Sequence, residues 1–262
     1  EQTANGFRLV KQLIQDLPAA PSQQLASTAQ AGLPPSRPID FSGWLQSALR
    51  EFRAHDIHLA AGGPDVAVRR VRVPLMSSRE LPEGVKWQVK DQLPFPIQDA
   101  VIDFRVLGEV WEKDLKKLDV LVAAAARPSM TALIAGVEQA GARVASVTPV
   151  PAAIWAAVAA LIPDVQKGSV VLVEIGAERT YVAIVKDGSL RVVRDLAIGS
   201  AHLTQALVGV VASEHGDVTV DAAMAEGFKR RYGVLADAVE GATEEGVPLF
   251  HLASLMRPVL ES

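Results

Sequence analysis

Residues 169–204, which read SVVLVEIGAERTYVAIVKDGSLRVVRDLAIGSAHLT, decide the fold of this chain. The β-branched run Val170–Ile175 predicts a strand that is buried on both faces. A second strand is expected over 179–185. The pair Asp187-Gly188 then indicates a type I′ hairpin, because both turn residues of such a hairpin need positive φ. A strand, a tight turn and a hairpin in this order predict a well-defined sheet element.

Two glycine turns border these strands. Gly176-Ala177 carries only small side chains, so a phosphate group could approach its backbone N–H groups. Gly199-Ser200 precedes a helix that is expected over 202–211, and its N–H groups could also face an anion. The turns therefore indicate a phosphate site, although an ordinary three-stranded meander would show the same pattern.

Composition excludes several classes of protein. The chain has 262 residues and a net charge of −4, which gives no general attraction to nucleic acid. It has no cysteine, and its five histidines are scattered without the spacing of metal ligands. No apolar run reaches the ~20 residues that a membrane helix needs. We therefore expect a soluble, intracellular protein without nucleic-acid binding and without membrane insertion.

A separate α+β subdomain is predicted between residues 66 and 149. Its pattern is strand, helix, strand, strand, helix, strand, and the last strand is expected over 144–147. Glycines and prolines border this stretch at both ends. Before it, residues 17–38 are rich in Pro, Ala, Ser and Gln and are expected to form a long loop.

Four segments resemble the PilM family of type IV pilus assembly proteins, within the superfamily of FtsA, MreB and actin. They are VRVPLMS (71–77), QVKDQLPFPIQDAVIDFRVLG (88–108), the stretch from Val173 to Thr204, and AEGFKRRYG (225–233). Each motif is modest alone, but the four occur in the order of the family. The resemblance covers the chain from about Asp40 onward.

The resemblance implies an α/β, actin-like (ribonuclease H-like) fold with two lobes and an FtsA/PilM-type inserted α+β subdomain. Residues 1–65 and 150–167 would form the first lobe, 66–149 the inserted subdomain, and 168–262 an incomplete second lobe. The first phosphate hairpin of the family is missing from this sequence. The chain is expected to start after that hairpin and to stop before the glycines on the adenine side.

The resemblance also implies a nucleotide site, with ATP and Mg²⁺ bound by the full-length protein and no cofactor bound by this fragment. Two departures oppose binding: Glu174 replaces the usual aspartate, and the carboxylate of Glu178 would face phosphate. Truncation and loss of nucleotide binding both remain open. The implied binding residues are Glu174, Gly176, Ala177, Glu178, Arg179, Thr180, Gly199, Glu226 and Lys229.

Three functions are consistent with the resemblance. The first is a cytoplasmic actin-like scaffold of the type IV pilus platform at the inner bacterial membrane, dependent on nucleotide or on self-association. The second is a nucleotide-free adaptor like GspL of type II secretion, and the third is a small-molecule kinase. A kinase needs an aspartate base near the γ-phosphate, and no catalytic residue can be assigned. At most a weak ATPase is expected.

The resemblance implies partners as well. PilM-like proteins bind the N-terminal cytoplasmic tail of PilN, a membrane protein, in a groove between the first lobe and the inserted subdomain, and contact other pilus or secretion platform proteins. Trp87, Phe95 and Ile97 are the candidate anchors, because Phe95 lies between two prolines on a rigid loop. The implied location is the cytoplasmic face of the inner membrane.

Overall fold

The computed structural model describes residues 2–3, 6–7, 11–13, 42–213, 215–235 and 240–261. The loop expected over 17–38 lies outside these residues. The chain divides into two compact units. Unit one consists of Glu1–Val170 and Ile184–Val193, and unit two of Val171–Ala183 and Arg194–Ser262.

Unit one contains a parallel pair of strands that is contacted by helices. Strand β3 (Asp56–Ala61) pairs with β7 (Arg143–Pro149). Helix α3 (Arg127–Gln139) and helix α4 (Val150–Leu161) both contact β7, and α1 (Ser42–Phe52) contacts α3. The apolar sequence of α4 suits its position against the two strands.

Strand β7 corrects the subdomain pattern expected from the sequence. The segment 144–147 was expected to pair within the 66–149 subdomain, but it pairs with β3 outside it. The short apolar sequence of this strand is compatible with either sheet, and only tertiary packing selects its partner. A short hairpin, β1 (Gln2–Thr3) with β2 (Gly6–Phe7), also belongs to unit one.

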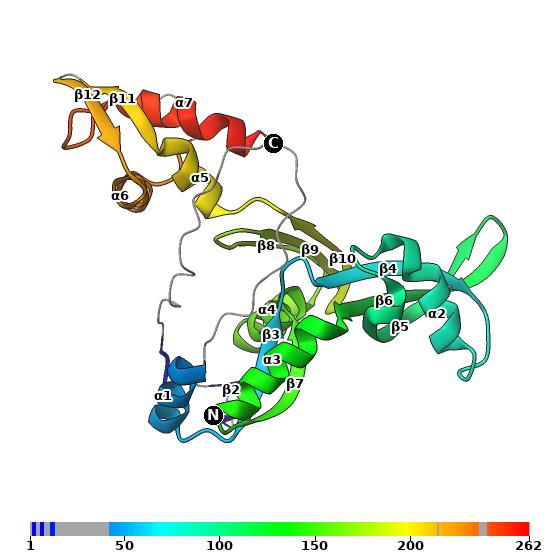
Figure 1. The fold of residues 1–262 in the computed structure, drawn as a ribbon. Helices are drawn as coiled ribbons and strands as arrows, with labels where there is room; N and C mark the ends of the chain where they lie inside the picture. Colours follow the sequence, from blue (N-terminus) through cyan, green and yellow to red (C-terminus); the bar gives the residue numbers. More distant parts are fainter. Residues whose placement is uncertain are drawn as a thin grey trace. The chain divides into compact units, whose positions relative to one another are not determined.

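The inserted subdomain is a three-stranded antiparallel sheet covered by a helix on one face. The sheet has the order β4-β6-β5, formed by β4 (Val66–Pro74), β5 (Ala100–Glu112) and β6 (Leu115–Ala126). Helix α2 (Leu81–Val89) lies against the sheet (Figure 1). The core between them is apolar. It consists of Val71, Val73, Leu81, Val85, Val89, Val120 and Val122.

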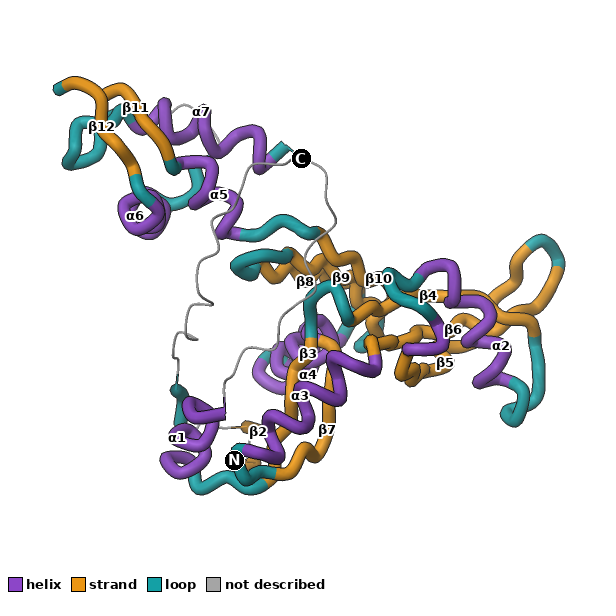
Figure 2. The backbone as a smooth tube through the Cα atoms, viewed as in Figure 1, coloured by secondary structure: helices purple, strands orange, loops and turns teal. Residues whose placement is uncertain are grey.

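Two short 3₁₀ turns, η1 (Lys90–Gln92) and η2 (Ile97–Asp99), connect α2 to β5. At the far end, β5 and β6 meet in a two-residue turn. Its residues, Lys113 and Asp114, have φ of 49° and 63°. Figure 2 shows the paired strands continuing as a two-stranded ribbon to this turn.

The stretch quoted first forms a three-stranded sheet in the order β10-β9-β8. Its strands are β8 (Ser169–Ile175), β9 (Thr180–Lys186) and β10 (Ser189–Leu196). The expected hairpin between β9 and β10 is confirmed, since Asp187 and Gly188 have φ of 48° and 73°.

Burial of β8 on both faces is not found. The side chains of Val171, Val173 and Ile175 are 64%, 55% and 66% exposed. They share one face of the strand because side chains alternate along it. The β-branched sequence predicted a strand correctly. It could not indicate that β8 is the last strand of its sheet among the described residues.

Helices and a hairpin make up most of unit two. Helix α5 (Ser200–Leu207) is followed by strands β11 (Gly209–Ser213) and β12 (Gly216–Val220). Helix α6 (Ala222–Tyr232) and helix α7 (Leu249–Leu260) complete the unit. Buried side chains of α5, α6 and α7, with Val211 and Val220, form one apolar core.

The helix expected over 202–211 is wrong in its second half. Helix α5 ends at Leu207, and the chain then extends into β11, which pairs with β12 from Gly209↔Val220 to Ser213↔Gly216. β-Branched Val208, Val210 and Val211 favour the extended conformation. Among the described residues, no helix is long and apolar enough to span a membrane.

Candidate functional site

A tight turn follows β8 in unit two. The N–H group of Gly176 donates to the carbonyl of Arg179 at 2.9 Å, which closes the turn. The Thr180 hydroxyl donates to the carbonyl of Ile198 at 2.8 Å, so it is used to hold β9 to the segment before α5. Glu178, at the tip of the turn, is exposed. The turn is therefore held by its own chain.

The start of α5 packs directly on this turn. The N–H group of Ser200 donates to the carbonyl of Gly176 at 2.9 Å, and the N–H group of Ala201 donates to the carbonyl of Ala177 at 2.7 Å. Helix N-termini carry unsatisfied N–H groups that commonly bind anions. Here the carbonyl oxygens of the turn occupy these two donors.

Gly199 allows this close approach. A Cβ atom on Gly199 would lie 2.5 Å from the carbonyl oxygen of Ala177 and 2.6 Å from that of Gly176. The N–H group of Gly199 donates to Nδ1 of His202 at 3.1 Å, and the N–H group of His202 donates to the carbonyl of Gly199 at 3.0 Å. The N–H groups of residues 199–202 all have partners within the chain.

The guanidinium of Arg179 is engaged in an ion pair within the chain. Its Nη2 atom donates to Oδ2 of Asp195 at 2.7 Å, and the two side chains are only 16% and 20% exposed. Removing either partner would leave a charge with little access to water, which is costly. The pair therefore fixes the turn to the end of β10.

Glu226 and Lys229 of α6 meet the start of α5. Nζ of Lys229 donates to the carbonyl of Ser200 at 3.1 Å and to Oγ1 of Thr204 at 2.8 Å. Oε2 of Glu226 pairs with Nζ of Lys229 at 2.5 Å and accepts from the Thr204 hydroxyl at 2.8 Å. Arg230 donates to the other carboxylate oxygen at 3.0 Å.

These contacts change the acidity of Glu226. Hydrogen bonds from Lys229 and then Thr204 favour the ionised carboxylate, and they lower the pKa of Glu226 from its ordinary value to about 2. The carboxylate is therefore charged at every physiological pH. Its charge is already balanced by Lys229 and Arg230.

The structure brings most of the predicted nucleotide residues together around the start of α5. Gly176, Ala177 and Gly199 lie at the turn, and Glu226 and Lys229 reach it through Ser200. Glu174 lies beside the turn, since its Oε1 would be 3.3 Å from a Cβ atom on Gly176. Their role in nucleotide binding stays a prediction.

A separate groove of about 150 Å³ lies within unit one. One wall is the face of the β4-β6-β5 sheet that α2 leaves uncovered, with Val68, Leu121 and Ala123. The other wall comes from the start of α4 and from β10. It is formed by Pro149, Pro151, Ala152, Leu190 and Val193.

The rim of this groove is polar. Asp103 and Arg105 of β5 lie at its edge, on a strand whose second edge is unpaired among the described residues. On the same sheet face, Arg70 holds the buried carboxylate of Asp119 with two hydrogen bonds of 2.6 Å. Nη1 of Arg191 on β10 lies 4.0 Å from that carboxylate. An apolar floor with a charged rim suits a short peptide.

The predicted anchors lie elsewhere in the subdomain. Trp87 is on α2 and is 67% exposed, with the Lys90 ammonium 4.5 Å from its ring centroid. Ile97 packs against the core beneath α2, and Phe95 is half-buried in the loop before η2. None of the three lines the groove, whose lining includes Leu121 instead. Their role in partner binding stays a prediction.

Comparison with known proteins gives the family. The profile of the family described as "Type IV pilus assembly protein PilM" matches residues 44–232. The chain belongs to the PilM family. No curated protein matches the sequence. The expected resemblance is thereby confirmed, because the matched segment includes the subdomain, the turn and α6.

A solved structure shows the same fold. A PilM chain from a "PilM-PilN type IV pilus biogenesis complex" has 24% identity and a TM-score of 0.66, covering 89% of this chain and 65% of that chain. This chain therefore spans less than two thirds of that relative. The likeness confirms the expected α/β, actin-like fold of PilM.

Two further structures are more distant. The cytoplasmic domain of EpsL, an inner membrane component of the type II secretion system of Vibrio cholerae, has 18% identity and a TM-score of 0.41, covering 63% of this chain and 60% of that chain. An ADP-bound MreB of Spiroplasma citri has 17% identity and a TM-score of 0.38, covering 52% and 45%.

Sequence reasoning missed the groove residues of this PilM family member. Leu121 and Ala123 lie in a run of small apolar residues on β6 that alternates between the two sheet faces. Pro149 and Pro151 were recognised only as a boundary of the subdomain. The groove is formed by strands β4, β5, β6 and β10 and by the start of α4. These segments lie far apart in sequence, and no local pattern indicates that they meet.

Proposed function

We propose that this PilM family member is a subunit of a type IV pilus assembly platform that binds the N-terminal cytoplasmic tail of a PilN-like membrane protein. The observation that carries this proposal is the apolar groove between the free face of the β4-β6-β5 sheet and the start of α4. The tail would bring the chain to the cytoplasmic face of the inner membrane.

The size of the groove supports a peptide ligand. Its volume of about 150 Å³ is well below the roughly 300 Å³ at which pockets for drug-sized molecules begin. Such a space accepts one or two apolar side chains of an extended segment. Edge strand β5 lies beside it, and its Asp103 and Arg105 could pair with polar groups of that segment.

Binding of ATP and Mg²⁺ stays a prediction. The described residues fit phosphate poorly, because the N–H groups of Gly199, Ser200 and Ala201 are engaged within the chain. The same engaged donors favour the alternative of a nucleotide-free, GspL-like adaptor of a secretion system.

The test uses Leu121→Ala and the N-terminal tail peptide of the cognate PilN-like protein. Leu121 is a half-buried wall of the groove, so its truncation should raise the Kd at least about fivefold. Fluorescence anisotropy measures the Kd, and the melting temperature shows that the variant is folded. Trp87→Ala and Phe95→Ala, on the α2 side, serve as matched comparisons.

The comparison separates two sites. Weaker binding only for Leu121→Ala supports the groove. An unchanged Kd for Leu121→Ala with weaker binding for Phe95→Ala would move the site to the α2 side. Unchanged binding in all three folded variants would remove both surfaces as the site of the tail.

A further inference from the structure

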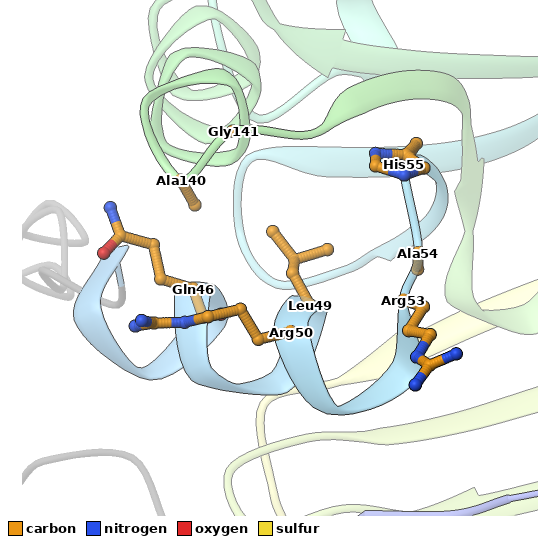
Figure 3. A pocket seen from close by; sticks show the side chains of 8 residues that line it. All are labelled: Gln46, Leu49, Arg50, Arg53, Ala54, His55, Ala140 and Gly141. Carbon is orange, nitrogen blue, oxygen red and sulfur yellow. The ribbon is translucent and has the colours of Figure 1, made fainter.

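A second, larger cavity of unit one opens between α1 and the end of α3. Its volume is about 580 Å³, and no residue of the peptide groove lines it. The floor contains Leu49 and Ala54 from α1 and its following turn, with Ala140 and Gly141 from the end of α3 (Figure 3). We call this cavity the α1–α3 basin.

Among the described residues, the charged side chains that line the basin are all basic. They are Arg50 and Arg53, His55 lines the basin beside them, and none of the described lining residues carries a carboxylate. The two acidic residues that flank the end of α1 already have partners, whereas Glu138, two residues before Ala140, is exposed. Glu51 pairs with Lys11 at 2.9 Å, and Asp56 pairs with Arg143 at 2.8 Å. Among the described residues, the side chains that line the basin therefore carry net positive charge.

Arg53 occupies a strained backbone position. Its φ is 51°, and the following N–H group, of Ala54, donates to the carbonyl of Leu49 at 3.2 Å, as in a helix C-terminal cap. Glycine is the usual residue at such a position. A side chain in the left-handed region costs about 1–2 kcal/mol.

The structure gives Arg53 no compensating contact. Among the described residues, its guanidinium makes no hydrogen bond or ion pair, and the side chain is exposed. The exposed guanidinium of Arg53 is therefore available to a ligand.

The arrangement favours an extended ligand over a single ion. Figure 3 shows Leu49 pointing from α1 toward the end of α3, while Arg50 and Arg53 extend to opposite sides of it. Cations that converge on one point would suit one phosphate group. Cations on either side of an apolar floor suit a segment that carries several carboxylates.

We propose that the α1–α3 basin binds an acidic, amphipathic peptide segment of a second partner protein. Apolar side chains of the segment rest on Leu49, Ala54 and Ala140, and its carboxylates pair with Arg50 and Arg53 at the rim. This site is separate from the groove proposed for the PilN-like tail, so the two segments can bind together.

The probe is a fluorescently labelled twelve-residue peptide of alternating Leu and Glu, titrated against residues 1–262 at low and high salt. Arg50→Glu with Arg53→Glu should raise its Kd at least about tenfold, because both rim charges become repulsive. Arg79 is exposed just before α2 and does not line the basin. The control variant Arg79→Glu changes the charge elsewhere and should bind the peptide with an unchanged Kd.

The variant Arg53→Gly distinguishes an effect on peptide binding from an effect on folding stability. Glycine relieves the positive φ, so the melting temperature should stay equal or rise, while the Kd for the peptide rises about threefold or more. A lower melting temperature with unchanged Kd would overturn the functional reading of Arg53.

Further outcomes decide the ligand class. A peptide with Lys in place of Glu should not bind. Equal binding of the Lys peptide, or no effect of the double charge reversal, overturns the proposal. Displacement of the Glu peptide by millimolar inorganic phosphate would identify a simple anion site instead. Tighter binding to phosphatidylglycerol vesicles than to the peptide would identify a lipid surface instead.

Discussion

At the scale of single residues, Ser200 connects the candidate phosphate turn to α6. Its N–H group donates to Gly176, and its carbonyl accepts from Lys229. Lys229 is only 13% exposed and also contacts Glu226 and Thr204. Residues that the family resemblance assigns to a nucleotide therefore hold α5 and α6 together in this chain.

Glu226→Gln tests the structural role of this network. The folded pKa of about 2 is below the ordinary value, so the ionised carboxylate stabilises the fold above about pH 4.5, and this stability is lost as the pH falls toward 2. We expect a loss of about 1 kcal/mol at neutral pH after solvent screening. The difference from the wild type should shrink on acidification.

Urea unfolding followed by circular dichroism at several pH values measures this difference. Glu138→Gln, which removes an exposed carboxyl from α3, is the matched control and should show no such pH dependence. A Glu226→Gln variant as stable as the wild type at neutral pH would show that the network contributes nothing to folding.

At the scale of elements, two packing choices place the candidate sites. Helix α5 begins against the turn after β8, and this uses the donors that an anion would need. Helix α2 covers one face of the β4-β6-β5 sheet and leaves the other face to the groove. Each choice depends on residues that lie far apart in sequence.

Gly199→Ala tests the docking of α5 on the turn. The added methyl group would overlap the carbonyl oxygens of Gly176 and Ala177, so we expect a loss of about 2 kcal/mol in the free energy of unfolding. Gly227→Ala is the control, because a Cβ atom there meets nothing within 4 Å. In mid-helix, that change should stabilise by up to about 1 kcal/mol. Equal stability of both variants would contradict the docking.

At the scale of the whole molecule, each unit carries its own candidate site. Unit one contains the peptide groove and the α1–α3 basin, and unit two contains the turn with α5 and α6. The peptide sites can therefore be tested without reference to nucleotide. The predicted nucleotide residues all lie in unit two.

Residues 1–262 should bind ATP with a Kd weaker than about 1 mM, with or without Mg²⁺. The reason is that the donors at α5 are engaged and that Glu178 would face the phosphates. Isothermal titration calorimetry measures the affinity. Micromolar binding would refute this expectation, and Gly176→Val should then abolish it, since a branched side chain would fill the turn.

The sequence by itself determined the local elements. The hairpin at Asp187-Gly188 and the strands of the inserted sheet follow from positive-φ turn residues and from alternation. The PilM family and its actin-like fold were also recognisable from four motifs in order. These features depend on residues close together in the chain, where physical preferences act directly.

Tertiary structure alone decided how these elements combine. The partner of β7, the exposure of Val171 and the end of α5 at Leu207 all differed from expectation, because packing overrides local propensity. The groove at Leu121 depends on segments that meet only in the folded unit. The donors of Ser200 could be judged only after their partners were known, since a sequence gives the number of N–H groups but not what they bind.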